Sequence, residues 1–238
     1  MGKAIVAGGK VGMEVPSAGI LASDLAVGST VKLMENGVAT EYLVVNQGIP
    51  SDSSLYDSSC DGTWLLRKNV CTSLTWSSNG LNMYSIGTIN SYLNSTFLSL
   101  FDNDTKNAIK QVKIPYVNGY GSSGSIDTGE NGLEVYAFVL SGYEIGFTAS
   151  KIPVDGVCLE YFVGATNSVR IAYDNSGSTS YWWTRSPINQ GTGAACAVSP
   201  AGALVDTSVS GTLGVRPTVI LPSNALFDQN TLTLKGVS

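Results

Sequence analysis

Short apolar runs, separated by residues rich in glycine, serine and asparagine, recur along this chain and predict mainly β-strands. Residues 31–34 and 38–45 form a predicted β-hairpin. The Asn36-Gly37 pair between them supplies the positive φ that a tight hairpin turn needs. Residues 63–68 predict a further strand. These runs indicate a sheet that contributes much of the core.

Two windows have helical periodicity instead. Residues 85–100 predict a helix that begins after Ser85 as N-cap. Its apolar side chains recur at three- and four-residue intervals and are Ile86, Ile89, Leu93, Phe97 and Leu100. A shorter helix is expected after the acidic cluster at residues 102–104, and Pro115 stops it. A hairpin, a strand, two helices and several later strands with long loops predict an α+β domain with a mixed or antiparallel sheet.

Three apolar runs near the C-terminus predict buried strands, at residues 181–187, 194–200 and 214–222. Trp182 and Trp183 are adjacent, and successive side chains of a strand face opposite sides. We therefore expect Trp182 to lie in the core and Trp183 to be partly exposed. Arg185 and Arg216 are expected to tie strand ends to loops, because a guanidinium binds several acceptors at once.

Composition narrows the classes of partner. Only 13% of the 238 residues are charged, against about 25% in average soluble domains, so the surface must be largely neutral and polar. The net charge of -5 and the lack of a basic run argue against nucleic-acid binding. No apolar run approaches the roughly 20 residues of a bilayer span, so no membrane insertion is expected. Residues 1–10 lack the apolar region of a signal peptide.

The chain contains no histidine, which removes Ser-His-Asp and Cys-His catalysis and histidine-ligated metals. Its four cysteines are Cys60, Cys71, Cys158 and Cys196. None forms a C-x-x-C pair, and we expect all four to be reduced. Whether Cys60 and Cys71 pair stays open. These features favour a protein that is not an enzyme.

Two motif matches have plainer interpretations. Residues 119–124 match G-x-G-x-x-G, but more loop follows where a nucleotide-binding helix would have to begin. Residues 102–106 start like a calcium loop and then place Lys106 where an oxygen ligand should be. We expect no metal and no cofactor, although a structural calcium ion elsewhere stays an open alternative.

The pattern Trp182-Trp183-x-Arg185-Ser186-Pro187, followed by Gly214-Val215-Arg216-Pro217, resembles a family of domains of unknown function from phages and prophages of gut Firmicutes. The resemblance extends upstream through residues 28–33, 63–68 and 89–94. It implies a C-type-lectin-like fold and a phage context. We therefore expect one such domain over residues 25–238, preceded by an arm or attachment segment at residues 1–24. The sugar-binding calcium motifs Glu-Pro-Asn and Gln-Pro-Asp do not occur, which argues against calcium-dependent lectin activity.

The resemblance and the loop composition together predict a tail-associated virion protein, assembled in the cytoplasm of the bacterial host, that adheres to a glycan or protein of the host surface. Recognition is expected on loops between Ser186 and Gly214, since loops on a rigid scaffold commonly carry binding. The candidate ligand-binding residues are Trp183, Ile188, Asn189, Gln190, Asp206 and Thr207. Expected partners are other virion proteins and copies of the chain itself, as in a trimer.

Two alternatives remain. The chain could be a structural decoration protein of the capsid or neck that recognises no ligand. It could also be an enzyme of the formylglycine-generating type, a class with the same implied fold. That class uses a reactive cysteine pair, and Cys196 has no near partner in the sequence.

Overall fold

The computed structural model of the chain describes residues 19–51, 54–119, 121 and 124–237. Strands account for 37% of these described residues and helical residues for 18%. The expected α+β, C-type-lectin-like domain with a mixed or antiparallel sheet and two helices is therefore wrong, because the fold is mostly β and divided among several sheets. Short strands in Ser- and Gly-rich segments that lack an apolar signature, such as β8 (Ser125–Asp127), account for much of the difference.

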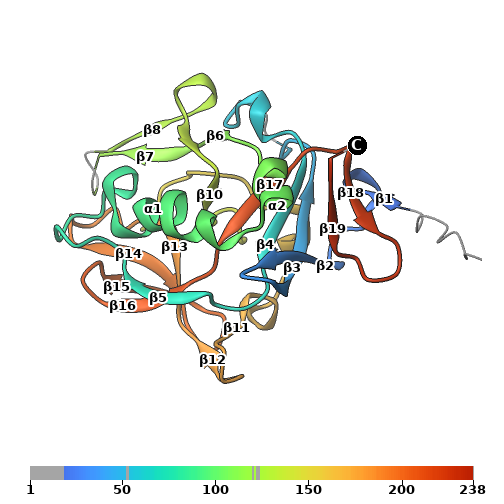
Figure 1. The fold of residues 1–238 in the computed structure, drawn as a ribbon. Helices are drawn as coiled ribbons and strands as arrows, with labels where there is room; N and C mark the ends of the chain where they lie inside the picture. The colour runs from blue at the N-terminus through green and yellow to red at the C-terminus, as the bar shows by residue number, and fades with distance from the viewer. Residues whose placement is uncertain (1–18, 52–53, 120, 122–123, 238) are drawn as a thin grey trace, which may run out of the picture.

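Two five-stranded sheets dominate the described residues (Figure 1). The first, sheet I, is antiparallel throughout and runs in the order β10 (Ala137–Phe138), β17 (Thr218–Leu221), β4 (Thr63–Arg67), β3 (Val38–Gln47), β2 (Thr30–Glu35). The second, sheet II, runs in the order β15 (Leu204–Ser208), β14 (Ala194–Val198), β13 (Trp182–Pro187), β16 (Thr212–Val215), β5 (Thr72–Thr75). Its β13 and β16 are parallel, and its other pairs are antiparallel.

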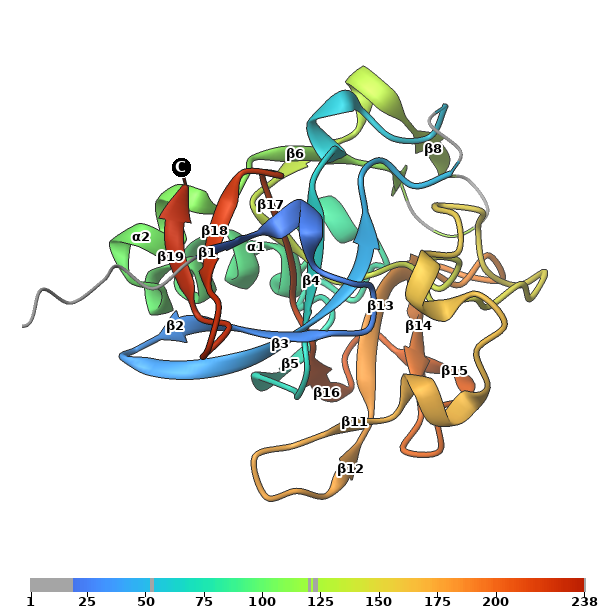
Figure 2. The same ribbon diagram turned by 90° about the vertical axis from the view of Figure 1, so that its right-hand side faces the viewer.

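Smaller sheets complete the described part of the chain. A three-stranded sheet contains β1 (Gly19–Leu21), β18 (Ala225–Asp228) and β19 (Leu234–Val237). The two-stranded pairs are β6 (Val112–Ile114) with β9 (Leu133–Val135), β7 (Tyr116–Asn118) with β8, and β11 (Ala172–Tyr173) with β12 (Thr179–Ser180). The last pair projects from the body of the molecule in Figures 1 and 2.

The predicted N-terminal arm lies outside the described residues as far as residue 18. The rest of it, residues 19–24, forms β1 and a 3₁₀ turn (Ala22–Asp24). β1 pairs with β18 near the other end of the chain, and Ala22 is fully buried. This end of the predicted arm is therefore part of the packed domain.

The predicted hairpin is present as β2 and β3. Asn36 and Gly37 adopt φ values of 49° and 77° at its turn, as the Asn-Gly signal requires.

The helical prediction is confirmed only in part. Residues 88–100 form the one long helical segment in the described part of the chain: α1 (Thr88–Tyr92), a π turn (Leu93–Phe97) and a 3₁₀ turn (Leu98–Leu100). Ile89, Leu93 and Phe97 face the core, but Ile86 is 61% exposed. Ile86 lies in a separate 3₁₀ turn (Tyr84–Ile86), so Ser85 caps no helix.

The predicted shorter helix is present as α2 (Asn103–Ala108). The side chain of Asp102 caps it by accepting a hydrogen bond of 2.8 Å from the Thr105 amide. This cap explains the acidic cluster that begins like a calcium loop.

Sheet I and strand β13 separate two buried clusters of apolar side chains. Along β17, Val219 and Leu221 face one cluster, while Ile220 faces the other. In β13, Trp183 joins the first cluster and Trp182 the second. The two indoles do point to opposite sides, as strand geometry requires, but both sides are buried. The prediction that Trp183 is partly exposed is therefore wrong, because it assumed that one face of the strand meets solvent.

Candidate binding surface

Arg185 of β13 lies inside the protein, 1% exposed, and uses all five of its N–H donors. Nη1 and Nη2 donate to the two carboxylate oxygens of Glu144 at 2.5 and 2.6 Å. Nε donates to the Pro115 carbonyl at 2.9 Å. The remaining two hydrogens bind the carbonyls of Val139 at 3.2 Å and Asp155 at 2.9 Å. The guanidinium therefore holds four chain segments against β13.

A second buried carboxylate lies beside this pair. Both side-chain oxygens of Asp155 lie within hydrogen-bond distance of Ser186 Oγ, at 2.8 and 2.9 Å. Burial raises the pKa of the Asp155 carboxyl to about 6, against the lowering effect of Arg185. Glu144 also accepts from the Tyr56 hydroxyl at 2.9 Å. Arg185 thus pairs directly with the Glu144 carboxylate, whereas the Asp155 carboxylate bonds to Ser186 and is affected by the Arg185 charge without a direct hydrogen bond.

Arg185 was predicted to tie a strand end to loops, but its partners Glu144 and Asp155 were not predicted. Glu144 lies 41 positions before Arg185 in the sequence, and Asp155 lies 31 positions before Ser186. Neither acid belongs to a local motif, so only the tertiary structure reveals these contacts.

This buried network is closed to solvent in the structure. Glu144 and Asp155 are both 0% exposed, and no substrate reaches them. Cys196, in the neighbouring β14, is also fully buried, and burial raises the pKa of its thiol to about 12. The thiolate, which is the nucleophilic form, is therefore scarce at neutral pH. The network is part of the framework.

All four cysteines are free thiols, and Cys71 and Cys158 are only partly buried. Burial raises the pKa of Cys60 and of Cys71 to about 12. Burial raises the pKa of Cys158 as well. The Sγ atom of Cys60 donates to the Lys113 carbonyl at 3.3 Å, so this thiol points into the interior.

Trp182 and Arg216 pack against each other. The Arg216 guanidinium lies over the Trp182 ring, 5.1 Å from Cζ to the ring centroid, and its Nε donates to the Arg67 carbonyl at 2.9 Å. Trp182 Nε1 donates to the Arg170 carbonyl at 2.9 Å. Both residues are buried. Arg216 thus contacts β4 and β13, one strand from each five-stranded sheet.

Two of the predicted ligand-binding residues lie in the core. Trp183 is 0% exposed, and its Nε1 donates to the Leu74 carbonyl at 2.9 Å. Ile188 is 4% exposed, because its side chain packs in the same apolar cluster as Trp182; its backbone amide donates to the Ala194 carbonyl at 3.0 Å at the base of the β13–β14 loop. Neither side chain presents a surface that a ligand could touch.

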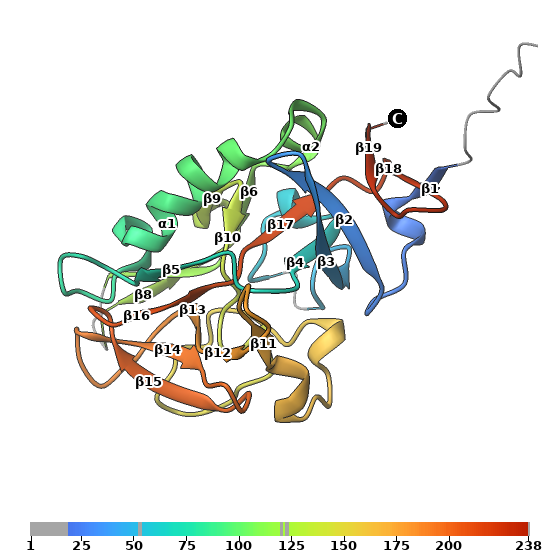
Figure 3. The ribbon, with the colours of Figure 1, turned by 60° about the horizontal axis from the view of Figure 1, so that its bottom comes forward.

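The other four predicted residues are not buried. The backbone amide of Asn189 donates to the Lys151 carbonyl at 2.8 Å, and the Lys151 ammonium forms an ion pair with Asp206. Gln190 follows Asn189 in the exposed loop, and Thr207 follows Asp206 in β15. We call Lys151, Asn189, Gln190, Asp206 and Thr207 the Lys151 surface. In Figure 3, β15 lies at the outer margin of sheet II, and β14 lies between it and β13.

No sequence pattern predicted that Lys151 belongs to this surface. It lies 55 positions from Asp206, in a segment without a recognisable motif.

A buried asparagine holds the loop at residues 188–194 in place. Asn82 is 0% exposed, and its Nδ2 lies 2.7–3.2 Å from three loop carbonyls: those of Ile188, Gly191 and Ala194. Its Oδ1 accepts from the Gly121 amide at 2.9 Å. A Cβ at position 121 would meet the Gly191 carbonyl oxygen at 2.6 Å, so only glycine fits. The loop is therefore fixed from beneath.

Replacement of Asn82 by leucine is expected to lower the free energy of unfolding by about 1–3 kcal/mol, because several buried carbonyls lose their donor. It is also expected to speed amide exchange across residues 188–194, which hydrogen-exchange mass spectrometry would measure. Asn107→Leu, at an exposed position of α2, is the matched control and should change the free energy of unfolding by about 0.5 kcal/mol or less. Unchanged exchange in Asn82→Leu would show that the side chain does not hold the loop.

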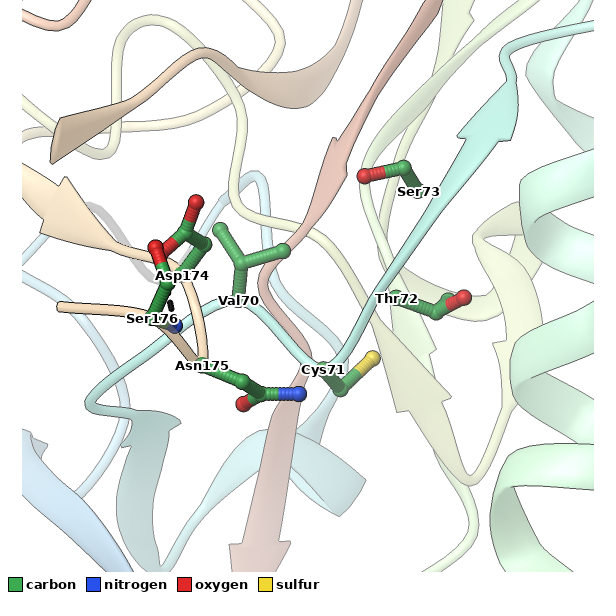
Figure 4. A pocket seen from close by; sticks show the side chains of 7 residues that line it. All are labelled: Val70, Cys71, Thr72, Ser73, Asp174, Asn175 and Ser176. Atoms are coloured by element: carbon green, nitrogen blue, oxygen red, sulfur yellow. Dashed lines mark hydrogen bonds between the residues drawn. The ribbon is translucent and has the colours of Figure 1, made fainter. Parts of the chain in front are cut away.

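Two recesses of the surface lie away from the Lys151 surface. One of about 250 Å³ is lined by residues 70–73 and by the turn at Asp174–Ser176 (Figure 4). Asp174 Oδ1 is occupied within this turn by the Ser176 amide at 2.8 Å. The Cys71 thiol points away from the turn (Figure 4).

A second recess, of about 420 Å³, lies between β5 and α1 and has Ile86 on its wall. Neither recess adjoins the Lys151 surface.

Within the described ranges, no three His, Cys, Asp or Glu side chains are grouped so that they could hold a metal ion. The helices described are too short or too polar to cross a membrane.

Comparison with known proteins gives one match. The model of a family described as a domain of unknown function, DUF6273, matches residues 61–223, more than half of the chain. The matched range contains both the buried Arg185 network and the Lys151 surface. No curated protein and no solved structure matches the chain.

Proposed function

The chain belongs to the DUF6273 family of domains of unknown function, and from its own residues we propose that it is a non-catalytic recognition domain of a phage or prophage virion. In this proposal it is carried on the tail and contacts the host surface through the Lys151 surface.

One contrast carries the proposal. The Arg185 network and its neighbouring thiol are held out of solvent, as Cys196, Glu144 and Asp155 show at 0% exposure. By contrast, the amide side chains of Asn189 and Gln190 project from a loop that Asn82 holds in place. Such rigid presentation suits binding, because an ordered loop loses little conformational freedom when a partner docks.

The chemistry of the Lys151 surface suits a polar target. Asn189, Gln190 and Thr207 carry amide and hydroxyl groups that both donate and accept hydrogen bonds. The ion pair between Lys151 and Asp206 is 31% and 42% exposed at its two side chains, so both partners can also contact a ligand. The phage context is supported by the resemblance of the β13 and β16 motifs to phage-associated domains.

The test is adsorption of particles whose chain carries Asn189→Ala, Gln190→Ala, Asp206→Ala and Thr207→Ala together. Adsorption to the bacterial host is expected to fall by about tenfold or more. A loss of only about 1.4 kcal/mol of binding free energy produces a tenfold effect. The thermal midpoint of the purified chain should change little, since these side chains lie outside the core.

The matched control is Glu41→Ala with Lys68→Ala, which removes an exposed ion pair from sheet I. It should leave adsorption unchanged. Normal adsorption of the fourfold variant, or cryo-electron microscopy that places the chain on the capsid or neck, would refute the proposal and favour a decoration protein.

A further inference from the structure

Arg216 and Arg185 are both buried, but only Arg185 is fully paired. Arg216 is 2% exposed, and in the described part of the chain its Nη1 atom has no hydrogen-bond partner. None of the ion pairs found there includes Arg216. The Trp182 ring contacts the guanidinium but supplies no negative charge that could balance it.

A second unpaired group lies two residues further along. Thr218 of β17 is 0% exposed, and its Oγ1 also lacks a partner among the described residues. Thr218 pairs across the sheet with Phe138 and Leu66, which belong to the same buried cluster as Trp182. Arg216 and Thr218 therefore enter one cluster from one side of the chain.

Two unsatisfied polar atoms that lie two residues apart in the sequence and face one buried cluster call for one explanation, because nearly all buried polar atoms in proteins have partners. Both groups can donate: a guanidinium has no acceptor, and a threonine hydroxyl carries one hydrogen. Burial lowers the pKa of Arg216 to about 10, which still leaves it protonated at neutral pH. The missing partner must therefore accept hydrogen bonds, and a negative charge would offset the cost of burying the cation.

The surrounding side chains limit the size of this missing acceptor. Trp182, Phe138 and Leu66 are each 0% exposed, so the partner must fit among packed side chains. A monatomic anion fulfils these conditions better than a carboxylate or a phosphate.

We propose that Arg216 Nη1 and Thr218 Oγ1 bind one small inorganic anion of the halide class, chloride in the cell, between β17 and the Trp182 ring. Such an anion neutralises the buried guanidinium and stabilises the contact between the two five-stranded sheets. This site is independent of the Lys151 surface.

The first test is crystallographic. Crystals of the full chain soaked in bromide are expected to show an anomalous peak within hydrogen-bond distance of both donor atoms. Density that refines as water, without an anomalous peak, would overturn the proposal.

The second test is thermal unfolding with chloride exchanged for gluconate at constant ionic strength. The thermal midpoint is expected to rise by roughly 5–10 °C when chloride is about a hundredfold above its dissociation constant. Thr218→Val keeps the shape of the side chain but removes a donor, and should lose most of this response. Arg216→Lys keeps the charge and should weaken the response.

Thr184→Val is the matched control, because Thr184 is equally buried but donates to the Cys196 carbonyl at 2.9 Å. It should lower the midpoint equally at every chloride concentration. Equal chloride responses in the wild type and in Thr218→Val would refute the proposal.

Discussion

Replacement of Arg185 by methionine is expected to lower the free energy of unfolding by about 3–5 kcal/mol. The substitution leaves Glu144 and Asp155 as buried carboxylates without a guanidinium, and it removes the donor of three backbone carbonyls. Such groups are costly because neither water nor another donor replaces the lost partner. Urea unfolding followed by tryptophan fluorescence would measure the loss.

Lys68→Met is the matched control, because it breaks an ion pair with Glu41 whose side chains are 45% and 48% exposed. The free energy of unfolding of that variant should fall by about 1 kcal/mol or less. The double variant Arg185→Met with Glu144→Met should regain part of the loss, because it leaves one fewer buried charge unpaired. A loss below about 1 kcal/mol in Arg185→Met would contradict the assigned role of the network.

Replacement of Asp155 by asparagine is expected to change how stability depends on pH. The pKa of this carboxyl is about 6 in the folded protein, against an ordinary value of 3.8. The folded state therefore keeps a proton that the unfolded chain releases between these two values. The stability that this group contributes is fully present below about pH 4 and is lost as the pH rises through 6. This difference between the two pKa values corresponds to a change of about 3 kcal/mol in the free energy of unfolding.

Asparagine does not titrate. As the pH rises from 4 to 7, the free energy of unfolding of Asp155→Asn should therefore rise by about 3 kcal/mol relative to that of the wild type. Urea unfolding at several pH values across this range would measure the difference. Thr184→Val, a buried substitution in the same strand as Ser186, should keep a constant difference from the wild type. If the Asp155→Asn difference stays flat within about 1 kcal/mol, the carboxyl does not change its protonation in this range.

Local signals in the sequence predicted local structure well. The Asn36-Gly37 turn fixed the β2–β3 hairpin, because positive φ at both positions needs no tertiary support. The apolar spacing of Ile89, Leu93 and Phe97 predicted the buried face of the long helical segment.

The fold class was mispredicted for two physical reasons. Strands as short as β10, β11 and β12, of two residues each, carry no detectable alternation of polar and apolar side chains. The helical periodicity, by contrast, stood out clearly although helices make up a minor part of the protein. The sequence patterns therefore predict a larger share of helix, relative to sheet, than the fold contains.

The candidate surface was predicted in part. Asn189, Gln190, Asp206 and Thr207 do reach solvent, as polar loop residues usually do. Trp183 does not, since a strand buried on both faces has no exposed side, and a single sequence does not show how many layers cover a strand.

Strand β17 lies between β10 and β4 in sheet I, although it comes from the last tenth of the chain. Sheet I therefore cannot close during synthesis until residue 221 has left the ribosome. Until then, the earlier strands of sheet I have unpaired edges, which are prone to pair with other chains. The yield of folded protein then depends on how well chaperones shield the nascent chain until β17 pairs with β4 and β10.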